Sequence, residues 1–234
     1  MFLSFEYLIF MVPAFLIVML AQWYVNSTYR KWSQVRNYMG INGSEAARRL
    51  LQFGGIPGVE IEQTPGQLSD HYDPRKKILR LSPGVAQGQS VASVAIAAHE
   101  IGHAVQDKVD YGPLRLRAAL VPAVSVSSSL GWILILLGLL LRSALGTQIA
   151  WIGVAVFALG AIFALATLPV ELNASARAQR LLVESGLIHT QAEQEGVQAV
   201  LRAAAWTYVA GLAAAILQLL YYVILVGGGG RRRR

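Results

Sequence analysis

The stretch VASVAIAAHEIGHAV, residues 91–105, decides how this chain is interpreted, because an apolar helix pattern there contains the pentapeptide His99-Glu100-Ile101-Gly102-His103. In a helix, positions i and i+4 lie on one face, so both imidazoles can reach a single Zn²⁺ ion and Glu100 can approach a water beside it. Ser93 is the only other polar side chain in the stretch. Ionisable groups on an apolar helix are costly to bury without a partner, whereas a chance motif on a solvated helix would come with more Lys, Glu and Gln. The stretch therefore predicts a zinc-hydrolase site.

The composition points to a membrane protein. The chain has 234 residues, of which 55% are hydrophobic, so a soluble domain is a poor description of it. Four apolar stretches approach or exceed the roughly 20 residues that cross a bilayer: Tyr7–Val25, Leu120–Leu141, Ile149–Val170 and Ala203–Val226. We therefore expect a mainly α-helical integral membrane protein with about four transmembrane helices. The first stretch is preceded by Glu6 and by no Lys or Arg, so we expect it to be an anchor and not a cleaved signal peptide.

The absence of cysteine limits the ligands of a zinc site, and the distribution of positive charge indicates on which side of the membrane that site lies. The chain contains no cysteine, so a zinc site must use His and carboxylate ligands. Of its 20 Lys and Arg residues, 12 lie between Asn26 and Arg117, which places this segment in the cytoplasm and the N-terminus outside. The net charge of +7 follows from the same bias, and no basic strand interleaved with aromatic residues indicates nucleic-acid binding.

The segment between the first two apolar stretches carries the predicted soluble elements. Ser44–Leu51 is expected to form a short helix, and Val59–Glu62 and Lys77–Leu81 alternate like strands. Ser90 is suited to cap the helix that carries the motif. A small β element thus lies next to that helix, and the exposed edge of the strand just before it could hold an extended peptide by main-chain hydrogen bonds.

These patterns give an expected division of the chain. It comprises an N-terminal transmembrane anchor (1–25), a cytoplasmic part with the motif helix (26–117), a transmembrane hairpin (118–170), cytoplasmic helices (171–202), a C-terminal transmembrane helix (203–226) and a flexible Gly/Arg tail (227–234). Three spans after the cytoplasmic part put Arg231–Arg234 outside, although Lys and Arg are usually enriched on the cytoplasmic side of a membrane protein. Either the tail is not native or the last segment does not cross fully.

A catalytic zinc ion needs three protein ligands and one open position. Two predicted spans separate His103 from Glu171, so Glu171 returns to the side of the membrane that holds the motif. An ionisable residue at the membrane end of a helix is costly and suggests a function. The alternative is an interfacial glutamate that caps the helix after Pro169. We favour Glu171 as the third ligand.

Several strings around the motif resemble the YugP-type neutral zinc metallopeptidases of bacterial membranes. They are Asp70-His71-Tyr72-Asp73-Pro74, Arg80-Leu81-Ser82, AAHEIGHAVQ, Tyr111-Gly112-Pro113-Leu114 and LPVELNASARA, and the resemblance runs from Lys31 to Ala210. It implies a zincin-like α+β metalloprotease domain with a gluzincin-like site, similar in layout to HtpX-like proteases. It also implies His99, His103 and Glu171 as zinc ligands and Glu100 as the catalytic base.

One position departs from the pattern of this family. Family members commonly read Glu-Phe-Asp-Ala-Ser where this chain has Glu171-Leu172-Asn173-Ala174-Ser175. Asn173 keeps hydrogen-bonding capacity but loses the charge, which puts a ligand-orienting carboxylate there in doubt. A donor that stabilises the oxyanion is also needed opposite Glu100. His71, Tyr72 and Tyr208 are candidates for that role, although a turn histidine, a turn aromatic and a core tyrosine would look the same in sequence.

The expected function is a membrane-bound zinc metalloendopeptidase of the inner cell membrane, multi-pass, with its active site facing the cytoplasm. A zinc-activated water, with Glu100 as general base, would hydrolyse peptide bonds of membrane-associated or misfolded proteins. Alternatives are an intramembrane protease, a catalytically silent scaffold that binds partners, and a metal transporter, which would need ligands at mid-span. Expected partners are a protein or peptide substrate and the lipid bilayer, without nucleic acid; membrane-protein partners and a homo-oligomer stay open.

Overall fold

The computed structural model describes residues 4–228, which form seven α-helices and one three-stranded sheet in two compact units. Among the described residues, the helical unit comprises 4–21, 115–168 and 208–228, and the sheet unit comprises Gln22–Leu114 and Pro169–Thr207. From residue 229 onward, the expected flexible tail lies outside the described residues.

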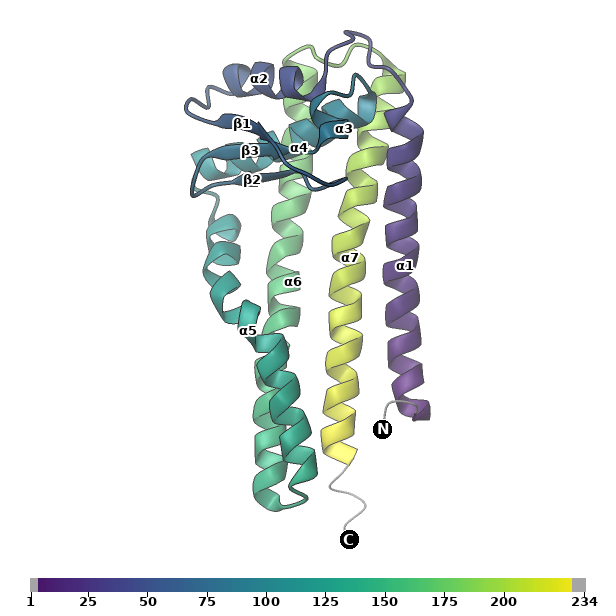
Figure 1. Cartoon of the computed structure of the whole chain (residues 1–234), viewed down its shortest axis with the longest axis vertical. Helices are drawn as coiled ribbons and strands as arrows, with labels where there is room; N and C mark the ends of the chain where they lie inside the picture. The colour runs from purple at the N-terminus through teal and green to yellow at the C-terminus, as the bar shows by residue number, and fades with distance from the viewer. Residues whose placement is uncertain (1–3, 229–234) are drawn as a thin grey trace. The chain divides into compact units, whose positions relative to one another are not determined.

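The sheet unit contains three short strands in the order β1-β3-β2 (Figure 1). β1 (Glu60–Gln63) runs parallel to β3 (Ile78–Leu81), and β2 (His71–Asp73) runs antiparallel to it. β2 was not predicted, because three residues are too few to show an alternating pattern. The expectation that the strand just before the motif helix offers an exposed edge is wrong. That strand is β3, and its hydrogen-bonding groups are used on both sides; the sheet's edges are β1 and β2.

Three helices of this unit lie against the sheet or against one another. α2 (Gly43–Phe53) begins one residue earlier than predicted, because Asn42 is its N-cap and accepts a hydrogen bond from the Glu45 backbone at 2.8 Å. α3 (Pro83–Ala86) is a single turn after β3. α4 (Val91–Lys108) carries the motif, and Ser90 caps it as predicted, accepting from the Ser93 backbone at 3.1 Å.

The core of the sheet unit holds α4 in place. Its fully buried large side chains come from four different elements: Leu50, Leu79, Leu81, Ile101 and Leu182. Each buried side chain of this size contributes roughly 1.5–3 kcal/mol relative to exposure. Ile101 lies inside the pentapeptide, so the turn that carries both histidines is fixed by packing on its opposite face.

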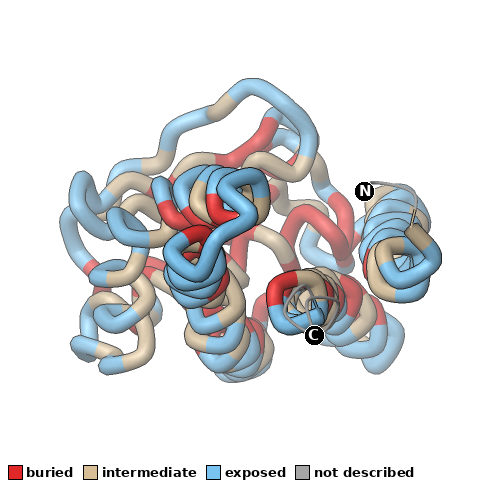
Figure 2. The backbone as a smooth tube through the Cα atoms, turned by 90° about the horizontal axis from the view of Figure 1, so that it is seen from below, coloured by how far each residue is buried: buried red, intermediate tan, exposed pale blue. Residues whose placement is uncertain are grey.

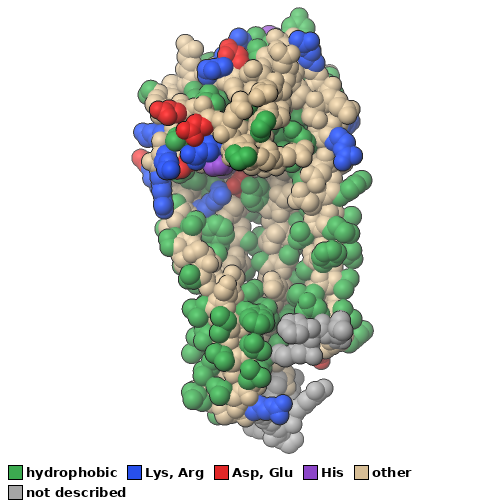
Figure 3. Space-filling view, viewed as in Figure 1, with side chains coloured by type: hydrophobic (Ala, Val, Ile, Leu, Met, Phe, Trp, Pro, Cys, Tyr) green, Lys and Arg blue, Asp and Glu red, His purple; other side chains and the backbone are tan. Residues whose placement is uncertain are grey.

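Within residues 4–228, four helices are long and apolar enough to cross a membrane, which is the predicted number: α1 (Phe5–Ser33), α5 (Gly112–Leu140), α6 (Ala144–Glu184) and α7 (Gln191–Gly228). Few residues of their most apolar segments are buried. Figure 2, seen from below, shows many exposed residues on the helices, and Figure 3 shows that the side chains exposed there are largely hydrophobic. Charged side chains gather instead over α2 and the strands (Figure 3). This is the distribution expected when lipid surrounds the long helices.

Two of these helices are longer than the sequence indicated. α6 continues through Pro169 to Glu184, and α7 joins the polar segment after Gln191 to the last apolar stretch without a break. A helix of 41 residues is about 60 Å long, whereas the bilayer core is about 30 Å thick. One crossing therefore accounts for about half of α6, and the last part of the helix, from Pro169 to Glu184, belongs to the sheet unit.

Candidate metal centre

His99 and His103 lie one turn apart on α4 and present their rings to the same point. The ring centroids are 4.9 Å apart and the planes are nearly perpendicular, at 84°. The Nε2 atoms lie 3.2 Å (His99) and 3.4 Å (His103) from one oxygen, Oε2 of Glu171 on α6. Glu171 is only 2% exposed. The three predicted ligands therefore converge, with Glu171 between both imidazoles.

These three side chains fit a zinc ion. Donor atoms about 2.0–2.2 Å from a tetrahedral zinc ion lie about 3.4 Å from one another, which is close to the two nitrogen–oxygen separations in the structure. Within residues 4–228, the cluster of candidate ligand atoms has three members, all within 4.8 Å of one another. Two imidazoles and one carboxylate are a donor set that zinc accepts, and three protein ligands leave the fourth position open for water.

Close contact between α4 and α6 brings Glu171 to the histidines. A Cβ atom at Gly102 would collide with the backbone carbonyl of Ala174, so only glycine allows the two helices to approach this far. Gly102 lies between the two histidines, and Ala174 lies one turn after Glu171. The glycine in the pentapeptide is thus needed for packing between the two ligand-bearing helices.

The outward nitrogen of each imidazole also has a partner. Nδ1 of His99 lies 3.2 Å from the Ser175 hydroxyl, and Nδ1 of His103 lies 2.9 Å from Oε1 of Gln106. Such partners orient a ligating histidine and leave its other nitrogen for the metal. Neither Ser175 nor Gln106 was predicted from the sequence to have this role. A signal for Gln106 existed, since it is a polar residue three positions after His103, on the helix face that carries both histidines.

The electrostatics of the cluster favour a cation. Burial alone would lower the pKa of the His103 imidazole, but its hydrogen bond to Glu171 and the negative charges of Glu171 and Glu100 raise the pKa above its usual range. The same negative potential that retains a proton on His103 attracts a divalent ion, which would replace that proton.

Glu100 is 7% exposed and follows His99 on α4. Among the described residues its carboxylate has no hydrogen-bond or ion-pair partner, although its charge acts on His103. A carboxylate next to the ligand cluster that is not used in structural contacts is available to exchange a proton with a water there.

The candidate oxyanion donors lie in different places. The Tyr72 hydroxyl donates to Oδ2 of Asp107 at 3.1 Å, and burial together with the negative charge of Asp107 raises its pKa, so it stays protonated. His71 is exposed on β2, with Nδ1 2.9 Å from the Ser69 carbonyl oxygen. Tyr208 is half-buried on α7 and belongs to the helical unit.

Asn173 is part of the hydrogen-bond network of the candidate metal centre. Its Oδ1 accepts hydrogen bonds from Nε2 of Gln106 at 3.0 Å and from Nε of Arg177 at 2.7 Å. Both contacts need an acceptor and neither needs a negative charge, so asparagine meets them as well as the aspartate common in the resembled family would.

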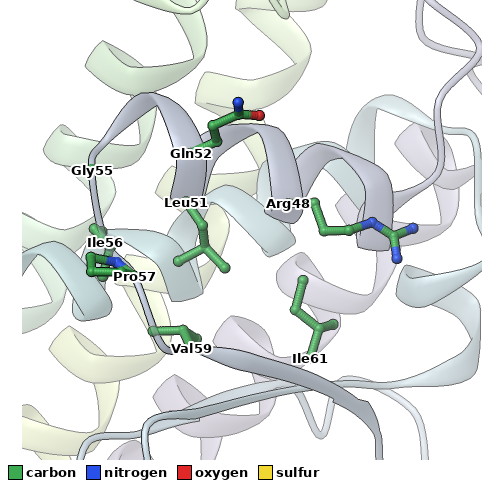
Figure 4. Close-up of a pocket in the computed structure, with 8 residues that line it drawn as sticks. All are labelled: Arg48, Leu51, Gln52, Gly55, Ile56, Pro57, Val59 and Ile61. Carbon is green, nitrogen blue, oxygen red and sulfur yellow. The ribbon is translucent and has the colours of Figure 1, made fainter.

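A separate groove of about 700 Å³ lies between α2 and β1 (Figure 4). Its lining is largely apolar, with Leu51, Ile56 and Ile61 pointing into it and Arg48 at one end. None of the three candidate ligands lines this groove. It is therefore a surface feature distinct from the metal centre.

Comparison with known proteins identifies the family of the chain. The model of a family described as "Putative neutral zinc metallopeptidase" matches residues 7–227. The chain is 41% identical over 199 residues to the "Putative membrane protease YugP" of Bacillus subtilis (strain 168), covering 85% of this chain and 87% of that relative. No solved structure matches. A family match over nearly the whole chain, together with a relative at this identity, shows that the chain belongs to the family of neutral zinc metallopeptidases.

Proposed function

We propose that this chain is a membrane-bound zinc metalloendopeptidase with a zincin-like, gluzincin-type site. The observation that carries the proposal is the convergence of the Nε2 atoms of His99 and His103 on Oε2 of Glu171, with Glu100 beside them. A third ligand that arrives on a separate helix from the pentapeptide is the gluzincin arrangement. Four apolar helices and a relative named a membrane protease support the location.

Each residue has a distinct role in this proposal. When bound, zinc supplies a Lewis acid that lowers the pKa of a water to about 7 and polarises a peptide carbonyl. His99, His103 and Glu171 would hold the ion. Glu100 takes the proton from the water as it attacks the carbonyl carbon, and then delivers that proton to the amine that leaves. The buried position of Glu100 limits competing hydrogen bonds with bulk water.

We further propose that the site faces the cytoplasm and acts on membrane-associated or misfolded proteins. The basic residues that flank the first span, Arg30, Lys31 and Arg36, support a cytoplasmic position for the sheet unit. Peptide hydrolysis at a site next to a small sheet favours extended, unfolded substrate segments over folded ones.

The first prediction concerns Glu100→Gln in the purified full chain. This variant should retain one zinc ion per chain and lose cleavage of an unfolded reporter protein by about 10²–10⁴-fold, because the amide cannot accept the proton. Metal content and cleavage are measured on the same samples, and Glu195→Gln, an exposed change on α7, is the matched control.

The alternatives give different outcomes. A fully active Glu100→Gln enzyme would remove Glu100 as the base. A wild-type protein that binds zinc but cleaves nothing would instead be the silent scaffold, and zinc passage across a vesicle membrane without cleavage would indicate a transporter. Cleavage restricted to transmembrane substrates, with none of soluble loops, would identify an intramembrane protease.

A further inference from the structure

Gln106 is the only glutamine among the fully buried side chains of the described residues, and it makes three hydrogen bonds there. Its Oε1 lies 2.9 Å from Nδ1 of His103. Its Nε2 donates to the Val170 backbone carbonyl at 2.8 Å and to Oδ1 of Asn173 at 3.0 Å. A buried amide of this kind is costly unless its groups are satisfied, and here both ends are used.

These partners fix the direction of the amide. A backbone carbonyl can only accept, so the Gln106 group that faces Val170 must be the NH₂ group. The Gln106 oxygen then has to face His103. Reversing the amide would place the Gln106 oxygen against the Val170 carbonyl oxygen of α6, and the Gln106 NH₂ group against the His103 imidazole.

The direction of the amide in turn fixes the tautomer of His103. Because Oε1 of Gln106 can only accept, Nδ1 of His103 must carry a hydrogen. The lone pair of a neutral His103 is then on Nε2, the atom that lies 3.4 Å from Glu171. Nδ1 thus keeps its hydrogen, and Nε2 is the nitrogen that is left for a metal ion.

The network continues along α6 to a permanent charge. Oδ1 of Asn173, which accepts from Gln106, also accepts from Nε of Arg177, whose guanidinium lies 5.8 Å from the centre of the Tyr111 ring. An arginine stays protonated, so it keeps Oδ1 of Asn173 as the acceptor end of that side chain. Asn173 therefore cannot turn its NH₂ group toward Gln106 without losing the Arg177 contact.

His99 lacks an equivalent constraint. Its Nδ1 faces the Ser175 hydroxyl, which can donate or accept by rotating, so this contact orients the ring without selecting a tautomer. The hydrogen bonds of the two histidines thus differ in effect: those around His103 select one tautomer, and that of His99 does not.

We propose that Gln106 is a positioning residue that locks His103 in its Nδ1–H tautomer, held in turn by Val170, Asn173 and Arg177. This inference rests on the proposed function, because it assigns Gln106 a role at the same metal centre. It predicts that Gln106 determines zinc affinity through His103 while taking no part in the chemistry on the substrate.

The test measures zinc affinity of the folded full chain by competition with a chelator. Gln106→Met removes the acceptor with little change of volume and should weaken zinc binding by about 10–100-fold. Gln52→Met, an exposed position on α2, is the matched control and should bind as the wild type does. Ser175→Ala, which leaves the tautomer of His103 untouched, should weaken binding less than Gln106→Met.

A second pair of variants keeps the proposal testable if Gln106→Met does not fold. Asn173→Asp retains an acceptor for both Gln106 and Arg177, so its zinc affinity should stay within about threefold of the wild type. Asn173→Leu removes the acceptor and should weaken binding by about 3–10-fold. Zinc affinity that is retained in Asn173→Asp but reduced in Asn173→Leu separates positioning from a general loss of packing, because both substitutions would disturb packing at this position.

A spectroscopic measurement adds a signature that a purely structural role would not produce. With ¹⁵N-labelled histidine, the zinc-loaded wild type should show His103 with a protonated Nδ1 and a metal-bound Nε2. Suppose that the wild type binds zinc tightly. If Gln106→Met then binds zinc equally tightly, or if His103 binds the metal through Nδ1, this inference is overturned and the proposed function stays intact. A wild-type protein that binds no zinc would overturn both.

Discussion

At the scale of the residue, Gly102 shows how packing and chemistry share one pentapeptide. The histidines on either side of Gly102 are candidate metal ligands, whereas Gly102 itself allows the backbone of α6 to touch α4 at Ala174. The position of Glu171 relative to the two imidazoles depends on that distance between helices. Any side chain at position 102 has to be accommodated by separating the elements that carry the ligands.

Gly102→Ala tests this reading. The added methyl group should destabilise the folded protein by about 1–3 kcal/mol and weaken zinc binding, because α6 must shift away from α4. Thermal unfolding and chelator competition on the full chain measure the two effects. Gly112→Ala is the matched control, since a Cβ atom there meets nothing within 4 Å. Equal stability and zinc affinity of both variants would show that the helices do not approach as described.

At the scale of the element, α6 and α7 show what local sequence signals miss. The expected division separated membrane spans from cytoplasmic helices at residues 170/171 and 202/203, yet α6 and α7 run through these positions without a break. A proline removes one backbone hydrogen bond and disfavours a helix locally, but membrane helices tolerate this where neighbouring groups compensate.

The beginning of α7 is fixed by a capping arrangement around Glu193. Its carboxylate accepts hydrogen bonds from the backbone of His189 and Thr190 and, through its other oxygen, from the backbone of Tyr38 at 2.8 Å. The Thr190 hydroxyl in return accepts from the Glu193 backbone at 3.1 Å, which completes a capping box. Burial alone would raise the pKa of Glu193, but these backbone hydrogen bonds lower it below its ordinary value of 4.5.

Glu193→Gln should therefore have a pH-dependent effect on stability. At pH 7 the variant should unfold about 2–4 °C below the wild type, because one cap is weakened. Since the folded pKa is lowered, the contribution of the carboxylate is complete above pH 4.5 and is lost as the pH falls through the lower folded value. The difference in Tm should thus shrink below pH 4.5. A difference that is constant from pH 7 to pH 3 would contradict the capping role, and the exposed Glu195→Gln serves as control.

At the scale of the whole molecule, the sequence predicted the parts of the site that have a local pattern. The spacing of His99 and His103 is a property of one helix, and Glu171 could be selected by counting spans between the two sides of a membrane. Gln106 and Ser175 could not be assigned in this way, because their roles depend on contacts between α4 and α6 over more than 60 residues of chain. The same holds for β2, whose existence depends on pairing with β3.

The sequence predicts the long membrane helices from hydropathy, but it shows their packing only in part. Hydropathy predicts which segments can enter lipid, and glycines then determine how closely they pack. In the helical unit, a Cβ atom at Gly138 of α5 would collide with the backbone of Gly146 and Ala150 of α6. Small residues at such contacts are typical of membrane helices that associate through their backbones.

The zinc affinity of Glu171→Ala, compared with that of the wild type in the purified full chain, tests the account most directly. Three ligands from two helices predict one zinc ion per wild-type chain and a loss of affinity of at least about 10²-fold when the carboxylate is removed. Glu184→Ala, an exposed change on the same helix, should bind zinc as the wild type does. Zinc held equally tightly by Glu171→Ala and the wild type would contradict the metal centre described here.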